Sequence, residues 1–212
     1  PYVIPGRTGT QLLPHDLAIL HSTLPNVNAV KEATGDLENM KLTRRLCGSD
    51  FDILSGDDDK TYEMMVNPEI RASGVVSVTS NVAPKAVQEL VESVRKQDLK
   101  RADELANALK PLFQIVTVKT DEETKFGTVT CKARNPLPYK TLMNILGMPS
   151  GPCRPPLGRM TLKGVTSLLE KVKTVYGKYP EVLQPIRDFF DVKLEERLTN
   201  KKYIERLYYG EY

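Results

Sequence analysis

The chain has 212 residues, of which 40% are hydrophobic, so it is long enough to bury the core of one domain or of a domain with an appendage. That size and composition exclude a chain that is disordered throughout. Its 30 lysines and arginines stand against 27 aspartates and glutamates, and this balance argues against a nucleic-acid or membrane-surface binder that works by charge alone.

Residues 14–96 alternate between short β-like runs and helical stretches, with a residue that begins or ends a helix at each switch. Asp36 is a predicted N-cap, Asp57 or Asp58 is another, and Gly48 is a predicted helix end. In chain order we predict a helix at 14–25, a strand at 27–31, a helix at 37–47, a strand at 51–54, a helix around 62–66, a strand at 74–78 and a helix from 84 to 94. Alternation of this kind indicates βα units and a parallel sheet. Three strands are too few for a closed (β/α)8 barrel, which has eight strands and typically about 250 residues.

The chain opens on a loop at residues 2–9, where a preceding strand would be expected, and this start resembles one cut from something longer. Beyond residue 98 we predict helices at 99–118, 139–146 and 162–175 and a helical tail at 180–209. We therefore divide the chain into a barrel-like region at 1–96, a helical domain at 97–177 and a tail extension at 178–212.

The predicted strands end in residues suited to chemistry, and the carboxyl ends of parallel strands are where active sites form. Lys31 ends the first of them, Gly56 directly follows the second, and Thr79 follows the third. A partly desolvated lysine yields the neutral amine more readily, and that amine can attack a carbonyl to form a Schiff base. The alternative is an ordinary strand-end lysine that reaches solvent or pairs with Glu32.

The opening loop supplies two further candidates. Tyr2 would relay protons if its hydroxyl reached the Schiff-base centre, and Arg7 offers a guanidinium fork suited to a carboxylate. The alternatives are an ordinary tyrosine and an exposed loop arginine.

Other kinds of site have little support. His15 and His21 are too far apart for a metal pair, and the acidic run at 57–59 is better explained as helix capping. The three cysteines form no C-x-x-C pair, which favours a reducing, cytoplasmic compartment, and no run approaches the roughly 20 apolar residues of a membrane-spanning helix. Phosphate-loop and dinucleotide-binding motifs are absent from the sequence. The tyrosines of the tail, which include Tyr212, are expected to dock on this protein or on a neighbour.

Four stretches in order resemble the motifs of the dihydrodipicolinate synthase family, within the N-acetylneuraminate lyase superfamily. They are YVIPGRTG at 2–9, VKEATGD at 30–36, LSGDD at 54–58 and GVVSVTSN at 74–81. The segments at 135–138 and 147–156 resemble the helical region of the same family. The similarity extends over residues 1 to about 177.

The resemblance implies an α/β fold, namely the C-terminal portion of a (β/α)8 TIM barrel with about three βα units, followed by a helical C-terminal domain. It implies a class I lyase that condenses pyruvate with L-aspartate semialdehyde in lysine and diaminopimelate biosynthesis, with no cofactor beyond a covalent lysine–pyruvate imine. Lys31 would form that imine and Tyr2 would relay protons. Arg7 would help bind the semialdehyde carboxylate, while Gly56 and Val76 would line the pyruvate site with backbone groups. A homo-oligomer, dimer or tetramer, is implied, without nucleic acid or membrane.

The sequence also departs from the family pattern. Val3 stands where the family usually has asparagine, and the match begins at the end of the fifth barrel strand. The half that supplies the pyruvate-holding threonines is therefore outside the match. Two alternatives remain: a sister pyruvate-dependent aldolase acting on N-acetylneuraminate or a keto-deoxy-sugar acid, and a non-catalytic half-barrel remnant or interaction module.

Overall fold

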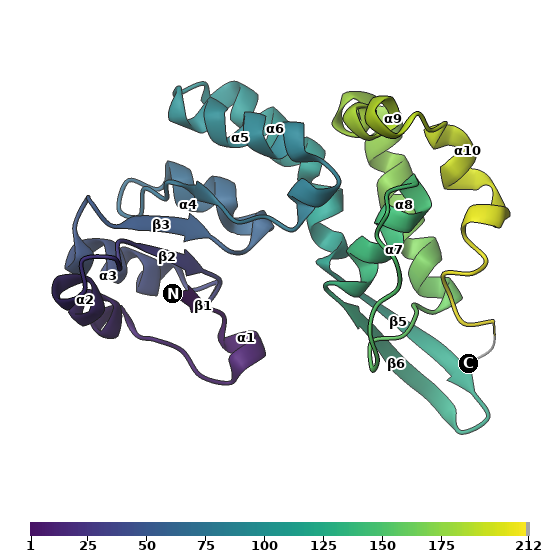
Figure 1. Ribbon diagram of the computed structural model, residues 1–212, viewed down its shortest axis with the longest axis horizontal. Helices are drawn as coiled ribbons and strands as arrows, with labels where there is room; N and C mark the ends of the chain where they lie inside the picture. Colours follow the sequence, from purple (N-terminus) through teal and green to yellow (C-terminus); the bar gives the residue numbers. More distant parts are fainter. Residues whose placement is uncertain (211–212) are drawn as a thin grey trace. The chain divides into compact units, whose positions relative to one another are not determined.

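The computed structural model describes residues 1–210, which form two compact units (Figure 1). The first unit comprises Pro1–Ser77 with Glu89–Glu104, and the second comprises Val78–Gln88 with the chain from Leu105 onward. The division therefore falls within two helices rather than at residue 96, and the predicted tail from 178 onward belongs to the second unit.

The first unit contains a four-stranded parallel sheet in the order β1-β2-β3-β4. Its strands are β1 (Tyr2–Val3), β2 (Ala29–Glu32), β3 (Asp52–Ser55) and β4 (Gly74–Val75). The parallel sheet and three of its strands agree with the prediction. The prediction that no strand precedes the first helix was wrong, because a two-residue strand is too short to show an alternating pattern.

Helices follow the strands of the first unit. They are α1 (Pro5–Thr8), α2 (Pro14–Thr23), α3 (Leu37–Cys47), the 3₁₀ turn η1 (Asp58–Lys60), α4 (Thr61–Val66), α5 (Pro84–Arg95) and α6 (Leu99–Phe113), of which α5 and α6 continue into the second unit. Asp36 caps α3 as predicted, since its carboxylate accepts the N–H groups of Glu38 and Asn39 at 3.0 and 3.2 Å. Of the two caps predicted for the next helix, Asp57 or Asp58, the Asp57 side chain makes no capping hydrogen bond to η1.

The core of the first unit lies between the sheet and these helices. Val30, Ile53, Met40 and Met64 are at most 1% exposed. A buried arginine, Arg44 of α3, ties the layers together by donating hydrogen bonds to several main-chain carbonyls. The acceptors and distances are Phe51 at 2.7 Å, Gly48 at 2.7 Å and Ile70 at 2.8 Å. Burial lowers the pKa of this guanidinium, and the main-chain carbonyls replace the water that would otherwise solvate its charge.

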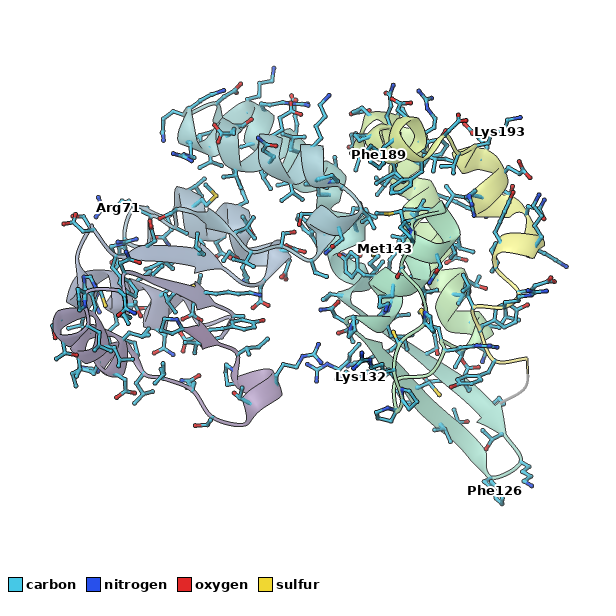
Figure 2. The ribbon with its side chains drawn as sticks, viewed as in Figure 1. Arg71, Phe126, Lys132, Met143, Phe189 and Lys193 are labelled. Atoms are coloured by element: carbon cyan, nitrogen blue, oxygen red, sulfur yellow. The ribbon has the colours of Figure 1, made fainter. Side chains whose placement is uncertain are left out.

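The second unit begins with the 3₁₀ turn η2 (Thr79–Asn81) and later carries a hairpin that the sequence did not predict. Strands β5 (Thr117–Thr124) and β6 (Gly127–Arg134) pair antiparallel after η3 (Gln114–Val116), where a helix to residue 118 was expected. The exposed face of this hairpin is polar, so the apolar period is weak. Figure 2 shows Phe126 at the tip of the hairpin, where 88% of its surface is exposed.

The rest of the second unit is helical. The elements are α7 (Leu137–Leu146), α8 (Leu162–Lys178), η4 (Pro180–Val182), α9 (Gln184–Phe190), α10 (Leu194–Thr199) and η5 (Lys201–Tyr203). The tail predicted as one helix is divided into short pieces, partly because Asp191 adopts a left-handed conformation with φ 49°. Tyr209 docks on its own chain by accepting the Arg159 N–H at 3.2 Å, whereas Tyr212 lies outside the described residues. Within residues 1–210, no helix is both long enough and apolar enough to cross a membrane.

Candidate functional site

Lys31 and Tyr2 lie on adjacent strands at the carboxyl edge of the first unit's sheet. The register of β1 and β2 places the two residues opposite each other, and the Lys31 N–H donates to the carbonyl of Pro1 at 2.9 Å. The Lys31 ammonium lies over the Tyr2 ring, 3.9 Å from its centroid. Lys31 is half-buried and Tyr2 is 47% exposed. The structure therefore brings together the two predicted catalytic side chains.

Gly56 lies directly after β3, beside the Lys31 side chain. Its N–H donates to the carbonyl of Glu32 at 2.6 Å. A Cβ atom built on Gly56 would lie 2.8 Å from the Ala33 Cβ and 3.2 Å from the Lys31 Cε. The absence of a side chain at this position is therefore what lets Lys31 lie against the end of β3.

Val76 and Arg7 also follow strands of this sheet. The Val76 N–H donates to the Ser55 carbonyl at 2.8 Å, so Val76 has its carbonyl oxygen, not its N–H, left to offer a ligand. Arg7 is exposed on α1, the single helical turn that directly follows β1 and ends at Gly9 with φ 69°. Both residues thus belong to connections at the carboxyl ends of strands, where the sequence placed them.

Two carboxylates near Lys31 were not among the predicted site residues. Glu32 is only 3% exposed, and its Oε1 accepts the Thr34 N–H at 2.7 Å. Because neighbouring strand residues face opposite sides of a sheet, Glu32 is turned away from Lys31, and the alternative of a Lys31–Glu32 pair was wrong. Burial raises the pKa of Glu32. Glu32 could have been found as a site residue because it directly follows Lys31 in the sequence of an apolar strand.

Asp57 is the second of these carboxylates. Burial raises the pKa of Asp57, and the negative charges of Asp59 and Asp58 raise it further, while the positive charge of Lys31 opposes the rise. The position of Asp57 is held by its main chain, because its carbonyl accepts the Ser55 hydroxyl at 2.8 Å. An acid that holds a proton more tightly than usual therefore lies within electrostatic range of the candidate nucleophile.

One strand-end residue noted in the sequence has a structural role instead. Thr79 is fully buried in the second unit, where its hydroxyl lies 2.5 Å from that of Tyr139. The Tyr139 hydroxyl in turn donates to the Leu112 carbonyl at 2.8 Å. This buried chain of hydrogen bonds joins η2, α6 and α7, so Thr79 contributes to packing.

The side chains at this edge include types that take part in carbonyl chemistry. Among the described residues, no group of three or more His, Cys, Asp or Glu side chains is arranged to hold a metal ion. The amine of Lys31, the phenol of Tyr2 and the guanidinium of Arg7 are a nucleophile, a proton carrier and an anion-binding group.

Comparison with known proteins gives a consistent result. The model of the dihydrodipicolinate synthetase family matches residues 2–175. A 4-hydroxy-tetrahydrodipicolinate synthase from Thermoanaerobacter sp. (strain X514) is 33% identical over 178 residues, which are 84% of this chain and 53% of the relative. The enzyme of the same name from Methanothrix thermoacetophila is 38% identical over 161 residues, which are 76% and 48% of the two chains.

A solved structure agrees with these relatives. The dihydrodipicolinate synthase of Aquifex aeolicus superposes with a TM-score of 0.69 and 30% identity, over 86% of this chain and 55% of that one. The chain thus spans about half the length of the curated relatives it matches.

Proposed function

The chain belongs to the dihydrodipicolinate synthetase family, and from that premise we propose that it carries the Schiff-base part of a 4-hydroxy-tetrahydrodipicolinate synthase active site. The reaction is the condensation of pyruvate with L-aspartate semialdehyde, a step toward diaminopimelate and lysine. Under this proposal, the four parallel strands of the first unit are the last strands of a barrel, and the helical domain of the family fold follows them.

The proposed chemistry starts at Lys31. Its neutral amine attacks the ketone carbon of pyruvate, and the carbinolamine loses water to give an imine in which nitrogen replaces the ketone oxygen. Loss of a methyl proton converts the imine to an enamine, whose carbon attacks the aldehyde of the second substrate. Each of these steps moves a proton, and Tyr2 is the proton carrier beside the Lys31 nitrogen. No cofactor is needed, because the imine itself withdraws the electrons.

The other site residues bind rather than react. Arg7 would hold the carboxylate of the semialdehyde through its guanidinium fork. Gly56 and Val76 would line the pyruvate site with main-chain groups, Val76 through its carbonyl. By the resemblance, the groups that hold the pyruvate carboxylate and complete the homo-oligomer belong to the part of the relatives that this chain does not match.

One observation carries the proposal: the Lys31 nitrogen lies 3.9 Å from the centre of the Tyr2 ring, on adjacent strand ends. The distance supports the proposal because both side chains lie at the carboxyl edge of the sheet, where parallel α/β enzymes have their active sites.

The test is to incubate the chain with pyruvate and borohydride, then measure its intact mass and map the modified peptide. We expect one reduced adduct, on Lys31, and none in Lys31→Arg. Lys60→Arg is the matched control. Lys60 is also half-exposed and lies in η1, after the neighbouring strand β3, but its ammonium pairs with Glu63 at 3.0 Å. An adduct that persists in Lys31→Arg, or no adduct in the folded wild-type chain, contradicts the proposal. Turnover with L-aspartate semialdehyde in a coupled reductase assay then tests the second substrate.

A further inference from the structure

The second unit contains a surface cavity of about 260 Å³ that the proposed reaction does not use. It lies between α7, the loop at 151–159 and the end of the tail. Its charged lining residues are Lys140, Arg159 and Arg206, and no described carboxylate lines it. A neighbouring cavity of about 320 Å³ shares Leu137 and Arg159 with the first and adds Lys132, again without a described carboxylate. Lys132 projects from β6 (Figure 2).

Hydrogen bonds hold the walls of the first cavity in place. The Lys140 Nζ donates to the Pro152 carbonyl at 2.9 Å, which fixes the ammonium and leaves further N–H donors for a ligand. The Asn144 Nδ2 donates to the Gly151 carbonyl at 3.0 Å and fastens the loop to α7. A site whose walls are already ordered loses less entropy when a ligand binds.

The charges of the cavity are not neutralised within the part of the chain that the structure describes. Neither Arg159 nor Arg206 forms an ion pair with a described carboxylate, whereas Arg101 pairs with Glu89 at 2.8 Å. Three cationic residues that line one cavity without a described counter-charge create a positive potential, which favours a bound anion.

We propose that this cavity binds a compact dianion, whose charged part is a phosphate group or a pair of carboxylates. The arginine fork matches the oxygen geometry of both groups and binds either of them through two parallel hydrogen bonds. The volume sets the size of the ligand, because pockets for drug-sized molecules usually measure about 300–1,000 Å³ and this one is smaller. The site lies within the second unit and is independent of Lys31.

The test is calorimetric titration of the full 212-residue chain at low salt with inorganic phosphate and, separately, with succinate. We expect one site whose affinity falls in high salt. In Arg206→Met the affinity should fall at least about tenfold, since a hydrogen bond to a charged group is worth about 1.5–3 kcal/mol. Arg159→Met should behave alike, because its hydrogen bond to the Tyr209 hydroxyl comes from the main chain and is retained. Arg154→Met is the matched control: Arg154 is an exposed arginine of the same loop that lines neither cavity.

Thermal unfolding with and without each anion gives a second readout and shows whether each variant is folded. Binding of phosphate alone, or of succinate alone, supports the site and identifies its anionic group. The proposal is overturned if neither anion binds or raises the unfolding temperature. It is equally overturned if Arg206→Met binds as tightly as Arg154→Met.

Discussion

Gly56→Ala tests whether the close approach of Lys31 to the end of β3 matters for both stability and chemistry. The added Cβ would lie 2.8 Å from the Ala33 Cβ, about 0.6 Å inside the 3.4 Å at which ordinary contacts begin. It would also lie 3.1 Å from the Glu32 carbonyl oxygen, which is main chain in the neighbouring strand and has little freedom to move. Overpacking of this kind usually costs about 1–3 kcal/mol, so we expect a loss of stability in that range.

The same substitution should also impair imine formation. The new methyl group meets the Lys31 Cε at 3.2 Å and would displace the amine from its place over Tyr2. Urea unfolding measures the first effect, and the rate of borohydride-trapped pyruvate adduct measures the second. Even a small misplacement of a reacting group is costly, and we expect the trapping rate to fall at least about tenfold.

Gly6→Ala is the matched control for this prediction. Gly6 lies in α1 at the same edge of the sheet, has no atom within 4 Å of a built Cβ, and does not adopt a positive φ. Alanine in that helical turn should be neutral or stabilise the chain by up to about 1 kcal/mol. Equal stability and equal trapping rates in Gly56→Ala and Gly6→Ala would refute the reasoning.

Two further substitutions test contacts away from this site. Hydrogen bonds from Thr161 and Thr120 lower the pKa of Glu122 in the folded chain. The ionised Glu122 therefore stabilises the fold at pH values above its pKa in the unfolded chain. This stabilisation is lost as the pH falls through the lower pKa that Glu122 has in the folded chain. Glu122→Gln should therefore flatten the acid side of a plot of melting temperature against pH and cost about 1 kcal/mol near neutral pH, and an unchanged acid limb would contradict this. Arg44→Met should lower the free energy of unfolding in urea by about 3–5 kcal/mol, because it leaves buried carbonyls without hydrogen-bond donors. Arg45→Met, on the exposed side of the same helix, should change the free energy of unfolding little. Similar losses of stability in the two variants would contradict a stabilising role for the buried hydrogen bonds of Arg44.

The ends of several helices were predictable because the signals are local. Asp36 before α3, Gly48 after it and Pro14 at the start of α2 each act within a few residues of their own position. The apolar stripe of α5 likewise follows from its own helical period. Such features require no knowledge of the rest of the fold, and the structure confirms them.

The β5–β6 hairpin was not predictable from apolar alternation. Its strands are joined by polar pairs, such as the Thr130 hydroxyl donating to Asp121 at 2.7 Å and the Thr128 hydroxyl donating to Glu123 at 2.9 Å. These pairs form only in the correct register, so neither strand shows the pattern alone. Asp121 and Thr130 are only nine residues apart, but the hairpin becomes recognisable only when both strands are considered together.

Burial that depends on contacts between residues far apart in the sequence was not predictable. Thr79 follows a strand, and its position indicated chemistry, yet its partner Tyr139 is 60 residues away in the sequence. Likewise, Glu32 was named only as an alternative ion-pair partner of Lys31, whereas in the structure it is buried and accepts the Thr34 N–H. A strand shows which residues alternate, but which face is covered depends on elements that pack later in the chain.

The charges around Lys31 explain why its neighbours matter to the proposed chemistry. The positive charge of Lys31 lowers the pKa of Asp57, against the burial that raises it. This electrostatic interaction connects the candidate nucleophile to an acid whose pKa is raised by burial. The buried Glu32 cannot substitute for Asp57 in this coupling, because it faces the other side of the strand. Asp57, the first acid of the run after β3, therefore lies within electrostatic range of the candidate nucleophile.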